Sequence, residues 1–187
     1  VFRQSMGSLI VTNAHRIVNG EKIVTDRKDG DFFLMERQTP ALAAKTIAEL
    51  YAERLPRAYS YSPLRDIQVL CPSKKGEAGT VNLNKILQSL VNPPSDNKNE
   101  LNSGFRLFRE GDKVMQIKNN YDITWIRDDG EQGSGIFNGD IGIIDSIDRK
   151  SRTLIVIFDD KTAKYTYEYA TDLDFAYAVT VHKSQGN

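Results

Sequence analysis

The sequence predicts an α/β fold that carries a small all-β insert, and the spacing of its apolar residues is the basis of that prediction. Up to residue 94, runs at helical spacing alternate with short buried strands, which is typical of an α/β layer. Beyond residue 103, short alternating runs are separated by Asp- and Gly-rich turns, which indicates β-strands. An apolar run over residues 175–181 then predicts a strand that returns to the α/β layer, so the β part is inserted and not appended.

Three helices are expected in the α/β part, because capping residues, Pro and Gly bound the apolar runs. The expected helices cover residues 5–18, closed by Asn19-Gly20; a segment begun by Thr39-Pro40 and ended by Pro56; and a segment capped by Thr80 and stopped by Pro93-Pro94. Strands are expected from β-type runs between turn signals. They are residues 31–36 and 66–71, and, after a polar linker at 95–103, residues 113–118, 136–147, 153–158 and 164–169.

Composition limits the classes of function. Lys and Arg together number 25, as do Asp and Glu, so overall charge gives no support for a nucleic-acid partner and any such contact must come from a local patch. The single cysteine, Cys71, excludes an internal disulfide and fits a reducing compartment such as the cytoplasm. No apolar run suggests a membrane or export, and His15, His182 and Cys71 fit no metal-binding spacing.

The most informative polar run covers residues 180–186, directly after the last predicted strand. Hydroxyls, an imidazole, a lysine, an amide and a glycine are groups that bind phosphate oxygens. Ligands bind at the carboxyl ends of strands in α/β layers, so this run is a candidate binding site. The alternative is an ordinary polar turn.

Two further segments are candidates for contact with nucleic acid. The glycine-punctuated loop before the third helix lacks the order of a P-loop, yet its amides could hold a DNA phosphate at Lys75, Gly79 and Thr80; the alternative is an ordinary strand-to-helix loop. The loop at 118–127 mixes cations and amides with Tyr121 and Trp125, which could stack bases, unless Trp125 packs on the β insert. The alternating tyrosines at 165, 167 and 169 are expected to pack in that insert.

Residues 180–186 resemble motif V of the RecD-like superfamily 1 DNA helicases, the family that includes the exodeoxyribonuclease V alpha subunit. The resemblance extends in order and spacing over nearly the whole chain. It is carried by residues 2–5 with 10–20, which are similar to motif IV and its helix, and by residues 66–84, 108–122 and 137–142.

The resemblance implies a piece of an ATP-dependent helicase with two RecA-like motor domains that moves 5′ to 3′ on single-stranded DNA. This chain would be the second motor domain with its inserted SH3-like barrel. Residues 1–102 would form the first part of the motor domain, 103–170 the barrel, and 171–187 the return to the motor domain. ATP and Mg would be bound mainly by the other motor domain, and no cofactor is expected in this chain.

The resemblance also assigns roles to residues. Arg3 would be an arginine finger that reaches the γ-phosphate of ATP, with Gln4 beside it. Thr180, His182, Lys183 and Ser184 would contact DNA, and Gln185 and Gly186 would couple that contact to the nucleotide. Motifs I to III and VI are missing, so the chain alone is expected not to hydrolyse ATP.

The partners that the resemblance implies are single-stranded DNA, the other motor domain and RecB/RecC-type subunits, with no membrane. A DNA-repair or recombination helicase is the first interpretation. The helicase part of a conjugative relaxase and a non-catalytic module that binds single-stranded nucleic acid are the alternatives.

Overall fold

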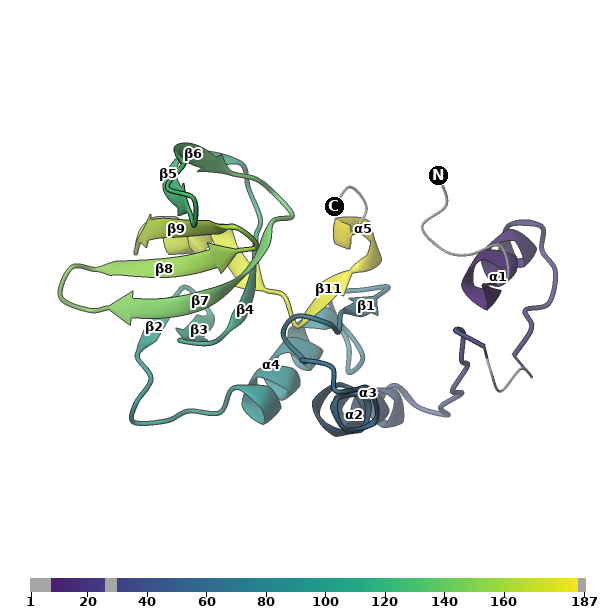
Figure 1. The fold of residues 1–187 in the computed structure, drawn as a ribbon. Helices are drawn as coiled ribbons and strands as arrows, with labels where there is room; N and C mark the ends of the chain where they lie inside the picture. The colour runs from purple at the N-terminus through teal and green to yellow at the C-terminus, as the bar shows by residue number, and fades with distance from the viewer. Residues whose placement is uncertain (1–7, 26–29, 185–187) are drawn as a thin grey trace. The chain divides into compact units, whose positions relative to one another are not determined.

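The computed structural model describes residues 8–25 and 30–184, which form two compact units, Val1–Gln38 and Thr39–Asn187 (Figure 1). Within the described residues, no helix is long and apolar enough to cross a membrane.

The first unit contains one helix within the described residues, α1 (Leu9–Val18), which is tied by hydrogen bonds to the chain that follows it. Ser8 is its N-cap and not a helical residue, so the helix begins later than predicted; residues 5–7 lie outside the described residues, and the predicted end at Asn19 is confirmed. The buried Asn13 side chain exchanges two hydrogen bonds with the backbone of Val24, at 2.7 and 2.8 Å. The Leu9 amide donates to Asp31 at 2.8 Å.

The strand predicted for residues 31–36 is wrong. These residues pair with no strand in the described part of the chain, and Phe33, Leu34 and Met35 are exposed. A β-strand needs a hydrogen-bonded neighbour, and sequence pattern alone does not supply one.

The second unit opens on a continuous helical segment made of α2 (Pro40–Glu49), the π-helical turn η1 (Leu50–Arg54) and α3 (Leu55–Tyr59). Its start is as predicted, because the Thr39 side chain accepts from the Leu42 amide at 3.2 Å. The predicted end at Pro56 is wrong. The wide π turn precedes the proline, which then occupies the first turn of α3, where its missing N–H and fixed φ are tolerated.

A parallel pair of strands, β1 (Val69–Cys71) and β11 (Ala178–Thr180), forms the sheet of the α/β part, so β1 is shorter than the predicted strand over 66–71. Helix α4 (Thr80–Val91) contacts both α2 and β11. A buried cluster joins these elements, consisting of Ala44, Ala48, Tyr51, Cys71, Leu83, Leu87, Tyr177 and Ala178. The parallel sheet of the described residues has two strands, so a full RecA-like layer is not evident in it.

The β insert is a curled sheet of seven strands in the order β10-β4-β7-β8-β9-β5-β6, with a separate β2-β3 hairpin (Figure 1). Its buried side chains form one core that includes Phe108, Ile144, Val156 and Tyr165. The strands are β2 (Glu100–Ser103), β3 (Arg106–Arg109), β4 (Lys113–Gln116), β5 (Asn120–Arg127), β6 (Gln132–Ile136), β7 (Ile141–Asp148), β8 (Thr153–Phe158), β9 (Lys161–Thr166) and β10 (Leu173–Phe175), with the 3-10 turn η2 (Tyr169–Asp172) before β10.

Several predicted strands in this part have different bounds. The run over 153–158 is found as predicted, whereas 136–147 is divided by a turn into β6 and β7. The segment expected to be a linker already contains β2, which pairs with β3. The 118–127 loop is largely strand β5.

The single strand predicted for residues 175–181 is also wrong. Its first residue ends β10, which pairs with β4 of the curled sheet, and its later residues form β11, which pairs with β1. The sheet of the insert therefore extends to Phe175, beyond the residue 170 expected from the sequence. An apolar run does not reveal that its two halves have different partners.

Candidate nucleic-acid interface

A cleft of about 300 Å³ lies where three parts of the second unit meet. The N-terminal half of α4, the β11–α5 segment and the β2–β3 hairpin each contribute to its walls; α5 covers Val181–Ser184. The polar and aromatic lining includes Thr80, Asn84 and Lys85 from α4, Thr180 and Lys183 from β11 and α5, and Phe105 and Arg106 from the hairpin.

The cleft is positively charged although the chain as a whole is neutral. Lys74, Lys85, Arg106 and Lys183 line it together with one carboxylate, Asp174. That carboxylate is already paired, because its Oδ1 accepts from Arg106 Nε at 2.8 Å. Partial burial lowers the pKa of Lys183, Asp174 opposes that effect, and the nearby cations add to it. A local excess of cations is the electrostatic signature of an anion-binding surface.

The two main walls of the cleft are joined by Asn84. Its Nδ2 donates to the Ala178 carbonyl at 2.9 Å, and its Oδ1 accepts from the Ala178 amide at 2.8 Å. This buried side chain therefore replaces a neighbouring strand for β11 and fixes α4 beside it. Thr80 of α4 and Thr180 of β11 both line the cleft as a result.

Three amides at the N-terminus of α4 already have acceptors within the chain. The Gly79, Thr80 and Val81 amides donate to the carbonyls of Gly76, Ser73 and Lys74, at 3.1, 3.2 and 3.1 Å. The amides that were expected to be exposed are therefore already bonded within the chain, and a DNA contact by Lys75, Gly79 and Thr80 stays a prediction. The loop folds back so tightly that a Cβ on Gly79 would lie 2.4 Å from the Lys75 carbonyl oxygen. Gly79 is the N-cap, and not Thr80 as predicted from the sequence.

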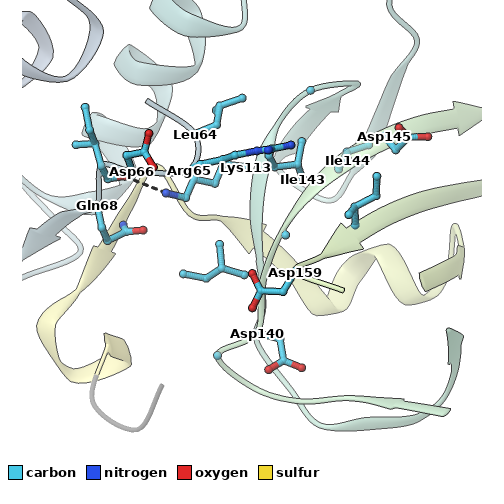
Figure 2. A pocket seen from close by; sticks show the side chains of 16 residues that line it. Leu64, Arg65, Asp66, Gln68, Lys113, Asp140, Ile143, Ile144, Asp145 and Asp159 are labelled. Carbon is cyan, nitrogen blue, oxygen red and sulfur yellow. Dashed lines mark hydrogen bonds between the residues drawn. The ribbon is translucent and has the colours of Figure 1, made fainter. Parts of the chain in front are cut away.

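A larger cavity of about 1110 Å³ lies between the segment before β1 and the curled sheet, and it suits nucleic acid poorly (Figure 2). Its charged lining consists of Arg65 and Lys113 with the carboxylates Asp66, Asp140, Asp145 and Asp159. The excess of carboxylates repels phosphates. Lys113 Nζ donates to the Ile67 carbonyl at 3.0 Å, the contact drawn as a dashed line in Figure 2, and burial lowers its pKa to about 8.

The chain is similar in sequence to known proteins. The sequence model of a protein family, the ATP-dependent RecD-like DNA helicase SH3 domain, matches residues 83–158, from within α4 to the end of β8. The whole chain is 30% identical to an ATP-dependent RecD2 DNA helicase of Deinococcus radiodurans. The chain is RecD-like. It is also 33% identical, over 65% of its length, to an uncharacterized protein of Methanocaldococcus jannaschii.

The RecD-like chain spans 22% of the Deinococcus helicase and 11% of the Methanocaldococcus protein. The resemblance expected from residues 180–186 and the other blocks is thereby confirmed, and the curled sheet is the SH3-like domain of that family.

The structure brings together some of the residues selected from the sequence. Thr80, Thr180 and Lys183 line the cleft, whereas His182 is exposed outside its lining and the Ser184 hydroxyl donates to the Val181 carbonyl at 2.8 Å. From the loop before α4, Lys74 lines the cleft and Lys75 does not. Arg3, Gln4, Gln185 and Gly186 lie outside the described residues.

The two aromatic candidates in β5 differ. Trp125 packs on the sheet: its ring lies so close over Gly133 that a Cβ there would be 2.4 Å away, and Arg127 and Lys161 each lie 5.0 Å from the ring centroid. Tyr121 remains exposed and contacts only the edge of Phe137 among the aromatic rings of the described residues, with centroids 5.7 Å apart. Tyr165 is buried and packs as expected.

The sequence reading missed Lys74, Lys85, Phe105 and Arg106 as site residues. Lys74 directly precedes the selected Lys75, and the i, i+4 spacing of α4 could have placed Lys85 beside Val81. The hairpin residues carried a weaker signal. Gly104 marks a turn, and Phe105 directly after it lies outside the alternating pattern of strand β3.

Proposed function

We propose that this chain is the second, RecA-like motor domain of an ATP-dependent DNA helicase, together with its SH3-like insert, and that the cleft holds single-stranded DNA. One observation carries the proposal: four cationic side chains from three separate segments line one cleft in a chain without net charge. The parallel β1–β11 pair covered by α4 would be part of the motor domain, and the curled sheet its insert.

The chemistry of the cleft suits the sugar–phosphate backbone. Lys74 and Lys183 offer mobile point charges, and Thr80 and Thr180 offer hydroxyls, all groups that bind phosphate oxygens without reading a base. A motor that moves along a strand must release each nucleotide in turn. Backbone contacts that are individually weak and screened by salt meet that requirement.

The remaining parts of the enzyme would lie elsewhere in the protein. We propose that Arg3 serves as an arginine finger toward ATP and Mg bound on the other motor domain, and that Gln4, Gln185 and Gly186 line the same nucleotide site. The described residues contain no cluster of His, Cys, Asp and Glu that could hold a metal ion. The similarity to an ATP-dependent DNA helicase of Deinococcus radiodurans supports ATP-dependent action on DNA. We further propose 5′ to 3′ movement, a role in DNA repair or recombination, a cytoplasmic location, and partners of the RecB/RecC type.

Titration of a fluorescent single-stranded oligonucleotide at several salt concentrations tests the cleft. Each phosphate contact adds about 0.7 to the slope of log affinity against log salt on a single strand. Lys74→Ala and Lys183→Ala should each lower affinity at low salt, reduce that slope by about 0.7, and do so equally for all base sequences. Lys150→Ala, an exposed lysine in the β7–β8 turn, is the matched control and should change neither quantity.

If all three lysine variants behave alike, the cleft is not the binding site. Tight binding that persists at high salt, or a strong preference for one base sequence, would instead support a non-catalytic binding module.

A further inference from the structure

The tip of the β2–β3 hairpin carries a phenyl ring that no other part of the described chain covers. Phe105 is fully exposed, whereas Phe108 on the same hairpin is fully buried. Gly104 adopts a positive φ of 61° just before it and turns the chain, so the ring projects at the point where the two strands are joined. A lone exposed apolar residue is ordinary on a protein surface, so exposure by itself indicates nothing.

The surroundings of Phe105 distinguish it from the other exposed apolar residues. It lines the basic cleft, together with Lys74 and Lys183 from the opposite walls. The next residue, Arg106, is held by its ion pair with Asp174 and by strand pairing with Ser103, so the base of the ring is fixed at the cleft. An aromatic face beside a groove of cations is the arrangement by which proteins bind unpaired nucleotides.

We infer that Phe105 stacks on a nucleobase of the strand whose phosphates lie against Lys74 and Lys183. This inference rests on the proposed function and adds to it a contact of a different kind. Stacking on a phenyl ring requires a base with a free face, which a single strand provides and a duplex does not. Because every base has such a face, the contact should favour single strands without selecting a sequence.

Comparison of two oligonucleotides of equal length, one of thymidines and one without bases, separates stacking from phosphate binding. Phe105→Ala should weaken binding of the thymidine strand by about fivefold or more and leave binding of the abasic strand unchanged. Phe105→Tyr should retain the affinity of the unaltered chain. Leu107→Ala is the matched control, because Leu107 is an exposed apolar residue of the same hairpin that does not line the cleft.

A fluorescent variant gives a second measurement that does not depend on loss of affinity. The chain has a single tryptophan, Trp125, which packs on the insert. Phe105→Trp therefore adds an exposed reporter at the hairpin tip. Its emission should be quenched by the thymidine strand and not by the abasic strand, beyond any change seen in the unaltered chain.

The outcomes are distinguishable. Suppose that Phe105→Ala leaves binding of the thymidine strand and of the abasic strand unchanged, while Lys183→Ala weakens binding of both strands. The stacking inference is then overturned and the proposed function stands. Equal losses on both strands would also overturn it, since they would show that the ring supports the cleft and does not contact a base. If the unaltered chain binds neither strand, the proposed function and the inference fail together.

Discussion

Replacing Asp112 should loosen the junction between the α/β part and the insert. This fully buried carboxylate lies between β3 and β4 and accepts four hydrogen bonds. Its Oδ1 accepts from Asn92 Nδ2 and the Tyr177 hydroxyl at 2.7 and 2.8 Å, and its Oδ2 accepts from Gln88 Nε2 and the Arg109 amide, both at 2.7 Å. Two of these donors belong to the end of α4, and one precedes β11.

The expected size of the effect follows from those donors. Asp112→Ala leaves the Tyr177 and Arg109 donors buried and unsatisfied, and each such group costs about 1–3 kcal/mol. Asn92 Nδ2 keeps its second acceptor, the Glu110 carbonyl at 3.1 Å. Gln88 keeps its second acceptor, the Leu107 carbonyl. Burial raises the pKa of Asp112 and opposes its ionised form, so its removal recovers part of the loss. We therefore expect a loss of about 3 kcal/mol in the free energy of unfolding, in the lower half of the range that two such groups give.

Urea unfolding at neutral pH, followed by circular dichroism, measures this loss. Asp112→Asn keeps one acceptor oxygen but turns an amide toward two donors, so it should lose about 2 kcal/mol and rank between the unaltered chain and Asp112→Ala. Asp128→Ala, at an exposed turn of the insert, is the control and should stay within about 0.5 kcal/mol. A loss below about 1 kcal/mol for Asp112→Ala would refute the view that this carboxylate joins the two parts.

Three further predictions concern other packed positions. Gly79→Ala should cost about 1–3 kcal/mol in thermal or urea unfolding, since its Cβ would overlap the Lys75 carbonyl; unchanged stability would show that the loop relaxes freely. Tyr165→Phe should cost about 1–2 kcal/mol, because it leaves Gln116 Oε1 without its donor at 2.9 Å, and a neutral result in the same assay would count against that bond. Burial lowers the pKa of Lys113 to about 8, from 10.5 in the unfolded chain, so the unfolded state binds more protons between these values. The unaltered chain should gain up to about 3 kcal/mol over Lys113→Met as pH rises through that window, and parallel pH profiles would contradict it.

Local chemistry made some of the fold predictable. The Thr39 cap, the end of α1 at Asn19 and the β8 strand follow from capping groups and alternation, which act over a few residues. The sequence predicted that the helix ends at Pro56. The π turn just before it places Pro56 in the first turn of α3, where its missing N–H is tolerated, and the sequence pattern gave no sign of that turn. Partners remote in sequence decided the rest of the fold.

The candidate site shows the same division. Residues 180–186 were a sound guide, since a polar run after a buried strand does lead to the cleft through Thr180 and Lys183. The amides at the start of α4 were expected to be exposed, and only the folded loop shows that the carbonyls of Gly76, Ser73 and Lys74 already accept from three of them. Phe105 was passed over because nothing local distinguishes a phenylalanine that will be exposed from one that will be buried.

The seam at Ala176 and Tyr177 restricts how this chain can change in length. Here β10 of the insert passes to β11 of the parallel pair with two buried residues between them and no loop. One added or deleted residue would turn every following side chain of β11 to the opposite face, which would remove Thr180 from the cleft. Where the chain enters the insert, residues 93–99 form an irregular connection between α4 and β2, and most of these residues are exposed. Relatives that differ in length at the borders of the insert should therefore have gained or lost residues in the connection from α4 to β2. The connection from β10 to β11 should keep its length.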